Sequence, residues 1–314
     1  MINSEYLNNL NKAQKEAVLY INGPLLIVAG AGSGKTKVLT SRIAHIIKQK
    51  KAFPNQILAV TFTNKAAKEM QSRVSSILKK EAVGLSWLGT FHSICAKLLR
   101  KHASAINLNS NFTIIDQDDQ NRLIKNICKA ENIDVKKLAP RYVLSIIDKW
   151  KNKGFYPNDV IIDKKNIYEK TVLPIYTIYQ NKLLDLNACD FGDLILHCVK
   201  IFENNSDINK IYSNNFKYIL VDEYQDTNFI QSKWLNLLAK KHKNICCVGD
   251  DDQSIYSWRG AEIKNFLEFD KVYKDTKIIR LEENYRSSQN ILSVASNLIE
   301  NNQNRVGKTL KTTM

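Results

Sequence analysis

Continuous apolar runs alternate with segments of helical spacing along the first hundred residues. Residues 25–28 form an unbroken apolar run, which predicts a buried strand, and the apolar positions of 38–47 recur every three or four residues, which predicts a helix. Apolar runs at 57–62 and 85–91 predict two further strands, and each is followed by another helical segment. Strands that alternate with helices indicate a parallel sheet with helices on both faces, so we expect an α/β fold.

The alternation of strands and helices stops after residue 107 and resumes at Tyr218. Residues 112–115 predict a short strand, Asp116 is suited to cap a helix over 117–131, and the chain then reads as mostly helical to about residue 198. We therefore interpret 108–185 as a helical insertion into the α/β domain. Later strands are expected at 218–223, 245–248 and 277–281, and helices at 142–150, 172–186, 191–202, 230–241, 263–269 and 291–299.

The segment between the first strand and its helix has the composition of a phosphate-binding loop. Its glycines allow the backbone to curl so that N–H groups face phosphate oxygens, and the helix that follows favours an anion at its N-terminus. Lys35 is expected to reach the β- and γ-phosphates of a nucleotide, and the Thr36 hydroxyl to bind Mg²⁺. The simple consensus has glycine at the position of Ala29. The candidate nucleotide-binding residues here are Ala29, Gly30, Ala31, Gly32, Ser33, Gly34, Lys35, Thr36 and Lys37.

Two acidic residues stand at the end of the strand predicted at 218–223. Asp222 has the position of a Walker B carboxylate, which holds the Mg²⁺ shell, and Glu223 can accept a proton from an attacking water. An acidic turn that caps the following helix is the alternative, and for these residues alone it is the commoner one. A phosphate-binding loop on the same parallel sheet favours the catalytic interpretation.

Two polar residues that follow later strands extend the candidate catalytic set. Gln253 carries no charge, so it would orient water or sense the γ-phosphate. Arg286 is placed to act as an arginine finger, which stabilises charge on the transferred phosphoryl group. Outside this context it would be an ordinary surface arginine.

An aromatic pair follows Gln253. Tyr256 and Trp258 are two residues apart, with Arg259 beside them. Aromatic faces interleaved with a cation suit stacking on single-stranded bases, which is worth about 1–3 kcal/mol per base. A buried aromatic cluster is the alternative, and the polar, glycine-containing surroundings weaken it.

Overall charge is a weaker indication of the partner. The formal net charge of +15 suits an anionic partner such as nucleic acid. A composition rich in Lys, Asn and Ile, typical of AT-rich genomes, explains the excess equally well. We interpret the lysines at 149–153 and 164–165 as solvated surface patches.

Cysteine usage and hydropathy indicate a cytoplasmic protein. The six cysteines form no C-x-x-C pair, which argues against a disulfide framework or a zinc site and for reduced, structural thiols. The chain shows neither a signal-peptide pattern nor an 18-residue apolar run, so no membrane association is expected.

In their order along the chain, these segments resemble the motifs of the UvrD/PcrA/Rep family of superfamily one DNA helicases. The phosphate-binding loop has the form that this family uses, which accounts for Ala29. Gly192 departs from the family's D-F-D-D-L pattern, where an acid is usual, and Tyr224 stands where phenylalanine is common. The matching segments are residues 10–14 (Q motif), 29–36, 59–67 (motif Ia), 89–93 (motif Ib), 190–194, 221–228 (motif II), 248–261 (motif III) and 284–287 (motif IV).

The resemblance implies ATP and Mg²⁺ as cofactors and DNA as partner. It implies that Gln14, on a helix capped by Asn11, reads the adenine and that Tyr285 stacks on it. It also implies a RecA-like first lobe built from 1–107 and 186–280, a helical subdomain over 108–185, and the start of a second RecA-like lobe at 281–314. The implied DNA-binding residues are Thr61, Phe62, Asn64, Thr90, His92, Tyr256, Trp258 and Arg259.

We therefore expect an ATP-dependent 3′–5′ DNA helicase that moves along single-stranded DNA and acts at junctions of single- and double-stranded DNA, in DNA repair. The 3′–5′ polarity rests on the resemblance alone. Most of the second lobe is missing from the sequence, which suggests a fragment, a split gene product or a decayed gene, and a partner that supplies the lobe or works in repair. Two alternatives stay open: a non-motor module that binds ATP and single strands, and the helicase portion of a recombination nuclease.

Overall fold

A computed structural model of the chain describes residues 5–162, 166–302 and 305–313. These fold into two compact units. The sheet unit comprises Met1–Phe91, Lys210–Thr227 and Leu235–Met314, and the helical unit comprises His92–Asn209 and Asn228–Trp234. The domain boundaries expected at 107, 185 and 280 remain a prediction. The lysines at 164–165 lie outside the described residues.

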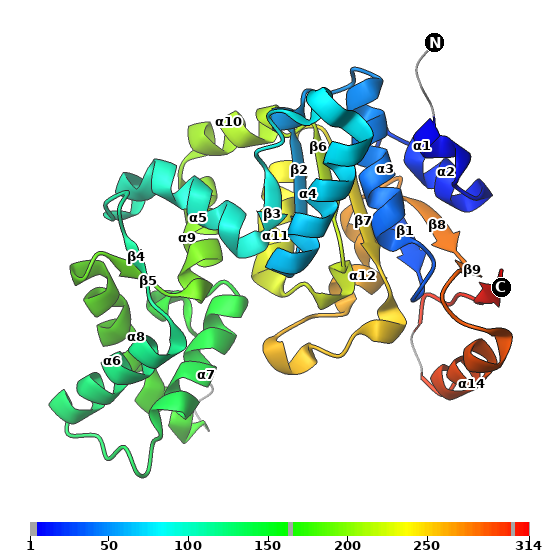
Figure 1. Cartoon of the computed structure of the whole chain (residues 1–314). Coiled ribbons are helices and arrows are strands. Elements are labelled where there is room, and N and C mark those ends of the chain that lie inside the picture. Colours follow the sequence, from blue (N-terminus) through cyan, green and yellow to red (C-terminus); the bar gives the residue numbers. More distant parts are fainter. Residues whose placement is uncertain (1–4, 163–165, 303–304, 314) are drawn as a thin grey trace. The chain divides into compact units, whose positions relative to one another are not determined.

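Six parallel strands form the central sheet of the sheet unit, in the order β3-β2-β6-β7-β1-β8 (Figure 1). Strand β1 lies between β7 and β8, where Ile27 pairs with both Val248 and Ile279. The parallel α/β sheet expected from the alternating pattern is therefore confirmed. The strands are β1 Leu25–Ala29, β2 Ile57–Thr61, β3 Leu88–Thr90, β6 Tyr218–Val221, β7 Ile245–Gly249 and β8 Lys277–Leu281.

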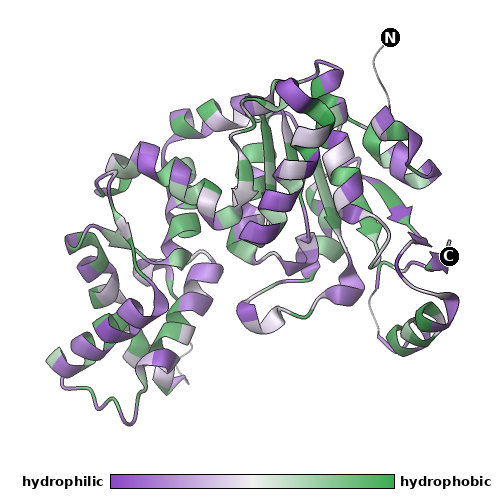
Figure 2. Cartoon of the chain, in the orientation of Figure 1, coloured by the Kyte–Doolittle hydropathy of each residue, from purple (hydrophilic) through white to green (hydrophobic). Residues whose placement is uncertain are grey.

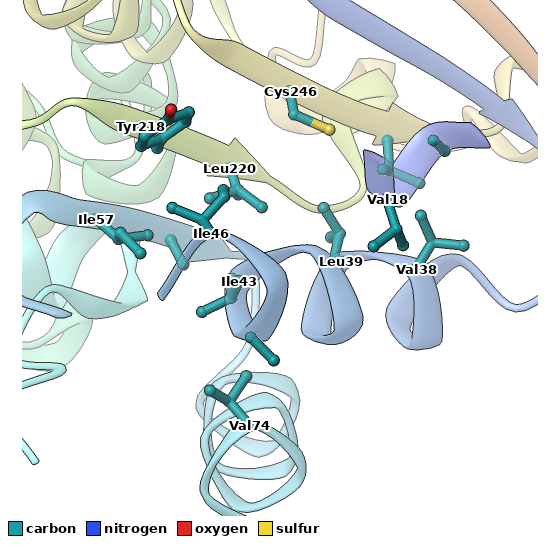
Figure 3. Close-up of a cluster of buried hydrophobic side chains, with 14 of the residues drawn as sticks. Val18, Val38, Leu39, Ile43, Ile46, Ile57, Val74, Tyr218, Leu220 and Cys246 are labelled. Atoms are coloured by element: carbon teal, nitrogen blue, oxygen red, sulfur yellow. The ribbon is translucent and has the colours of Figure 1, made fainter. Parts of the chain in front are cut away.

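Three helices near the N-terminus pack over one face of this sheet. Apolar side chains of α3 and α4 meet those of β2, β6 and β7 in one buried cluster, which Val18 of α2 joins (Figure 3). Coloured by hydropathy, the strands are mainly hydrophobic, whereas the helices carry both polar and apolar residues (Figure 2). The helices and remaining strands of the sheet unit are α1 Glu5–Asn8, α2 Lys12–Leu19, α3 Lys35–Lys48, α4 Asn64–Leu78, α12 Lys264–Leu267, α13 Phe269–Val272, α14 Gln289–Ile299, β9 Glu283–Asn284 and β10 Lys311–Thr312.

The helical unit has a hydrophobic core of its own, built from α6, α7 and α8. Its two short strands, β4 and β5, pair in parallel. Asp116 caps α6 as predicted, because its side chain accepts hydrogen bonds from two N–H groups of the first turn. The elements of this unit are α6 Gln117–Ala130, α7 Pro140–Asn152, α8 Ile167–Asp185, α9 Phe191–Asn204, β4 Thr113–Ile114 and β5 Ala188–Cys189. Helices α5 Phe91–His102, α10 Ser206–Asn215 and α11 Phe229–Ala239 contain residues of both units.

The predicted solvated patch at 149–153 is wrong at its central residue. The side chain of Lys151 is fully buried, and its ammonium lies 2.6 Å from Asp190 Oδ2 and 2.7 Å from Asp193 Oδ1. Tyr179 donates a further hydrogen bond to Asp190. Burial alone would lower the pKa of Lys151, but the charges of the two carboxylates raise it instead. Lys151 is therefore the cation of a buried ion cluster with Asp190 and Asp193.

Gly192 makes room for this cluster. A Cβ at Gly192 would lie 2.9 Å from Lys151 Cδ and 3.3 Å from its Cβ. Any larger residue, including the acid of the family pattern, would press on the lysine stem. The departure noted in the sequence therefore has a local packing reason.

Other differences from the predicted elements are small. Helix α10 and strand β5 were not predicted, and the helix expected at 263–269 is two short helices separated at Glu268. Both Phe266 and Phe269 are buried, and the break allows the second to pack edge-on against Tyr224. None of the helices in the described part of the chain has the length and apolar composition needed to cross a bilayer.

Candidate nucleotide and DNA sites

The candidate nucleotide-binding residues lie at the carboxyl ends of the parallel strands. The phosphate-binding loop follows β1, the acidic pair follows β6, the Gln253 segment follows β7, and the Arg286 segment follows β8. In a parallel sheet these ends share one edge, which is where open α/β sheets bind ligands. Residues that are distant in sequence therefore lie at the same edge of the sheet.

The phosphate-binding loop has the conformation that its glycines permit. Gly32 and Gly34 have φ values of +72° and +89°, a region that other residues rarely adopt, and Gly34 caps the start of α3. Ser33 is buried, and its hydroxyl donates to Gly30 O over 2.7 Å. The loop therefore ends at the N-terminus of α3, where free N–H groups attract a phosphate.

Gln14 joins α2 to this loop. Its side chain accepts from the N–H of Asn11, and Asn11 in turn accepts from the N–H of Gln14, so the pair forms a capping box. The Gln14 amide donates to Ser33 O over 2.9 Å. The buried guanidinium of Arg42, on α3, donates to the last-turn carbonyls of Ala17 and Tyr20. Helix α2 is thus held from both ends beside the loop.

Lys35 and Glu223 are in direct contact. The Lys35 ammonium, in the first turn of α3, lies 3.0 Å from Glu223 Oε2. Glu223 has a φ of +49°, in the left-handed region, which is strained for a residue with a side chain. The predicted Walker A lysine and the predicted catalytic acid therefore belong to one site.

Asp222 is buried beside this pair. Burial raises its pKa to about 6, the charge of Glu223 adds to that effect, and Lys35 opposes it. Burial and the charge of Glu223 raise the pKa of Asp226 to about 6 as well, while Lys35 and the hydrogen bond from Gln225 oppose the rise. Asp222 has a raised pKa and forms no ion pair within the part of the chain that the structure describes. A divalent cation would satisfy such a buried carboxylate, so the acidic end of β6 fits Mg²⁺.

Gln225 was not among the candidates, yet it joins the acidic pair to the turn after β7. Its amide donates to Glu223 Oε2 over 3.0 Å and to Asp226 Oδ2, while its carbonyl accepts from the N–H of Asp250. A Cβ at Gly249 would lie 2.5 Å from Gln225 Oε1, so glycine is required there. Its position inside the matching segment 221–228 was the only available sequence signal.

The segment after β8 packs directly on the phosphate-binding loop. Asn284, also missing from the candidates, donates to Ala31 O over 2.6 Å, and the N–H of Tyr285 donates to Gly32 O over 3.0 Å. The Tyr285 hydroxyl accepts from Asn11 over 2.9 Å. A Cβ built on Gly32 would lie 2.6 Å from the Cβ of Arg286, so this arginine packs against the loop. The structure thus brings Tyr285 and Arg286 together with Gln14 and the loop.

Three further predicted residues are placed at the edge of the site. Thr36 follows Lys35 in the first turn of α3, and Lys37 is exposed and donates to Asn9 O. Gln253 ends the short helix η6 (Asp251–Gln253), is exposed, and donates to Asp250 Oδ2. Gln253 is therefore connected to Glu223 through Asp250 and Gln225.

The aromatic pair is exposed, which contradicts the alternative of a buried cluster. Trp258 is 73% exposed, and the ring centroids of Tyr256 and Trp258 are 6.3 Å apart. The Arg259 guanidinium lies 5.2 Å from the Tyr256 ring centroid and 4.7 Å from that of Trp258. Part of this group forms the short helix η7 (Ser257–Arg259). The surface offers two ring faces and a cation to solvent, as stacking on bases requires.

The other predicted DNA-binding residues lie at or just after the carboxyl ends of β2 and β3. Thr61 pairs with Thr90 in the strand register, and both are buried. Phe62 contacts Phe91 edge-on at 5.6 Å, and exposed Asn64 begins α4. His92 belongs to the helical unit, where its ring meets that of Phe191 at 5.8 Å.

Together, the parallel sheet, the glycine-rich loop and the acidic strand end define a P-loop protein with a RecA-like sheet. The family described as UvrD/REP helicase N-terminal domain matches residues 10–274. The chain therefore belongs to this family.

Several named relatives match along nearly the whole chain. A probable DNA helicase II homolog of Rickettsia conorii is 52% identical over 315 residues, which cover 99% of this chain and 48% of the relative. The ATP-dependent DNA helicase PcrA of Staphylococcus epidermidis is 48% identical over 306 residues, 98% of this chain and 42% of the relative. The PcrA of Staphylococcus aureus is 47% identical over the same length. The chain spans about half the length of the curated relatives that it matches.

Replacing Trp258 by alanine is expected to weaken single-strand binding and to spare nucleotide binding. The indole is exposed and lies on a different segment from the residues around the phosphate-binding loop. Loss of one stacking platform costs about 1–3 kcal/mol, which is about 5- to 150-fold in affinity. Fluorescence anisotropy of a labelled oligothymidylate measures this change.

Phe53→Ala is the matched control for Trp258→Ala. Phe53 is 72% exposed on the sheet unit and lies outside every predicted motif, so its loss should leave the affinity for the oligonucleotide unchanged. Equal affinities of wild type and Trp258→Ala would contradict the stacking role.

Proposed function

We propose that this chain carries the ATP-binding part of an ATP-dependent DNA helicase that moves 3′ to 5′ on single-stranded DNA, working in DNA repair in the cytoplasm. The observation that carries this proposal is the contact between Lys35 and Glu223 at the sheet edge, with Tyr285 and Arg286 packed on the same loop. The names of the relatives, DNA helicase II and PcrA, support the activity. Six free, buried cysteines suit a reducing compartment.

On this proposal, ATP occupies the phosphate-binding loop. The loop N–H groups and Lys35 bind the β- and γ-phosphates, while Gln14 and Tyr285 contact the adenine. Thr36 and Asp222 would hold Mg²⁺, which neutralises charge on the phosphate oxygens. Arg286, beside Gly32, would stabilise charge on the transferred group.

The Lys35–Glu223 ion pair suggests how the base is controlled. The triphosphate would compete with Glu223 for the Lys35 ammonium. Glu223 freed from the lysine could accept the proton of the attacking water, with Gln253 orienting that water. Gln225, which donates to Glu223, would hold the carboxylate in place.

The DNA partner is proposed to be a single strand, with activity at junctions to duplex. Tyr256, Trp258 and Arg259 are the described residues best suited to stack on bases, and Phe62, Asn64, Thr61, Thr90 and His92 are proposed to lie along the same strand. A second-lobe or repair partner protein is also proposed. Its support is α14, where Ile291, Val294 and Leu298 recur at helical spacing and are exposed.

A non-motor module that binds ATP and single strands is the second candidate. The observation that favours it is that every described contact of the phosphate-binding loop comes from the sheet unit. On this candidate function, the sheet unit would hold the nucleotide by itself. Such a module would bind both ligands without moving along DNA.

Strand separation tests the proposal against this alternative. Duplexes with a 3′ or a 5′ single-stranded tail are incubated with the chain and ATP, and Lys35→Ala serves as the inactive control. The proposal predicts ATP-dependent separation of the 3′-tailed duplex alone. Binding of both ligands without strand separation would favour the non-motor module.

A further inference from the structure

The chain from Arg305 to Thr313 contacts three parts of the nucleotide site, and we refer to residues 305–313 as the clamp segment. Its strand β10 pairs with β9, which precedes Tyr285 and Arg286. The Leu310 side chain lies 2.7 Å from a Cβ built on Gly30, so it packs on the phosphate-binding loop. The third part is the turn after β7, where residues 250–252 are acidic.

A lysine of the clamp segment occupies this acidic cluster. Carboxylate oxygens of Asp250, Asp251 and Asp252 lie within 4.8 Å of one another, a spacing that suits a metal ion. The Lys308 ammonium, however, lies 2.6, 3.1 and 2.6 Å from one oxygen of each. Its side chain is 3% exposed. The cation that neutralises the cluster is therefore part of the chain itself.

Arg305 and a backbone group add to this contact. The Arg305 guanidinium binds both oxygens of Asp252, at 2.6 and 2.7 Å, and the N–H of Val306 donates to Asp251 over 2.8 Å. Burial opposes ionisation of Lys308 and Asp252, but their hydrogen bonds prevail, so the pKa of Lys308 is raised and that of Asp252 is lowered. Paired, charge-assisted bonds of this kind fix geometry strongly.

The turn at residues 250–253, which the clamp segment contacts, links the nucleotide site to the proposed base-stacking loop. Asp250 accepts from the Gln253 amide, and its own N–H donates to Gln225, which donates to Glu223. Three residues after Gln253 the chain reaches Tyr256, and two residues later Trp258. A shift of this turn would therefore move the proposed γ-phosphate sensor and the proposed base-stacking loop together.

We propose that Lys308 and Arg305 are positioning residues that hold the 250–253 turn, so that a nucleotide at the phosphate-binding loop alters the affinity of the 256–259 loop for single-stranded DNA. This inference rests on the proposed function, because it needs both ligands to bind. A purely structural role would instead change stability and leave the link between the two ligands intact.

The test measures the link directly on the full 314-residue chain. The dissociation constant of a labelled oligothymidylate is determined with and without a saturating, non-hydrolysable ATP analogue and Mg²⁺, and the ratio of the two values is the coupling factor. Wild type should give a factor of about 5 or more, in the range of ordinary allosteric coupling. Lys308→Met should reduce the factor to below about 2, while Lys308→Arg, which keeps the charge, should recover most of it.

Two further measurements keep the result interpretable. The affinity of Lys308→Met for the analogue alone should stay within about threefold of wild type, because the ammonium contacts the turn rather than the phosphate-binding loop. Arg305→Gln removes the paired contact with Asp252, leaves Lys308 in place and should lower the coupling factor by about half, so it tests the inference even where Lys308→Met does not fold.

The outcomes separate this inference from the proposed function. A folded Lys308→Met or Arg305→Gln with the wild-type coupling factor would overturn the positioning role, and so would a wild-type factor of one with both ligands bound. In either case both ligands would still bind, and strand separation would test the proposed function independently. A wild-type chain that binds neither ligand would refute the proposed function itself.

Discussion

Lys35→Ala is expected to lower the rate of ATP hydrolysis by about 10²- to 10³-fold, the usual effect of removing one group that stabilises transition-state charge. The ammonium lies in the first turn of α3, 3.0 Å from Glu223, and is proposed to bind the β- and γ-phosphates. Nucleotide affinity should also fall, because a charge-assisted hydrogen bond contributes about 1.5–3 kcal/mol. Phosphate release and titration with a fluorescent ATP analogue measure the two effects.

Lys51→Ala provides the control for lost positive charge. Lys51 is exposed just after α3 and outside the site, so its replacement should leave both the rate and the affinity unchanged. If Lys35→Ala hydrolysed ATP within twofold of wild type, the role of this lysine would be refuted.

Lys151→Met is expected to destabilise the helical unit by about 3–5 kcal/mol, the cost of removing one partner from a buried ion pair. The variant leaves Asp190 and Asp193 buried without their cation. The urea-unfolding midpoint at pH 7 measures the loss, and amide hydrogen exchange locates it in α7 and α9.

The pH dependence of this variant has a defined sign. Burial already raises the pKa of Asp190, and loss of the ammonium raises it further above its unfolded value. Protonation of such a carboxyl stabilises the folded state. The difference in free energy of unfolding between wild type and the variant should therefore become smaller as the pH falls from 7 to 5.

Lys149→Met is the matched control, because Lys149 lies on the same helix, in the same lysine patch, and is exposed. It should unfold at the wild-type urea concentration. A Lys151→Met variant as stable as Lys149→Met at pH 7 would contradict the buried ion cluster.

The sheet and the phosphate-binding loop could be predicted because their signals are local. Residues 25–28 are an unbroken apolar run, and a loop of alternating glycines needs the φ values that Gly32 and Gly34 adopt. The capping pair of Asn11 and Gln14 also depends only on residues three apart. Parallel pairing then follows from the alternation of strands and helices.

The missed residues depend on contacts between distant parts of the chain. Gln225 acts through the turn after β7, and Asn284 through a loop more than 250 residues earlier. Lys308 contacts Asp252, which lies 56 residues earlier in the sequence. No local pattern distinguishes such residues from ordinary surface amides and lysines.

The burial of Lys151 could have been predicted from its helical spacing, although it lies in a run of lysines. It stands four residues after Ile147 and eight after Val143, on the buried face of α7, whereas Lys149 and Lys153 do not share that spacing. Interpreting the three lysines as one patch ignored the helical period. A charge at a core position of a helix predicts a buried partner, here the acids that begin α9.

We would first measure steady-state ATP hydrolysis by the 314-residue chain, with and without single-stranded DNA and with Lys35→Ala as the blank. We expect turnover above the blank that rises when single-stranded DNA is added. Turnover equal to the blank under both conditions would contradict the proposal that this chain carries the ATP-hydrolysing site of a DNA helicase.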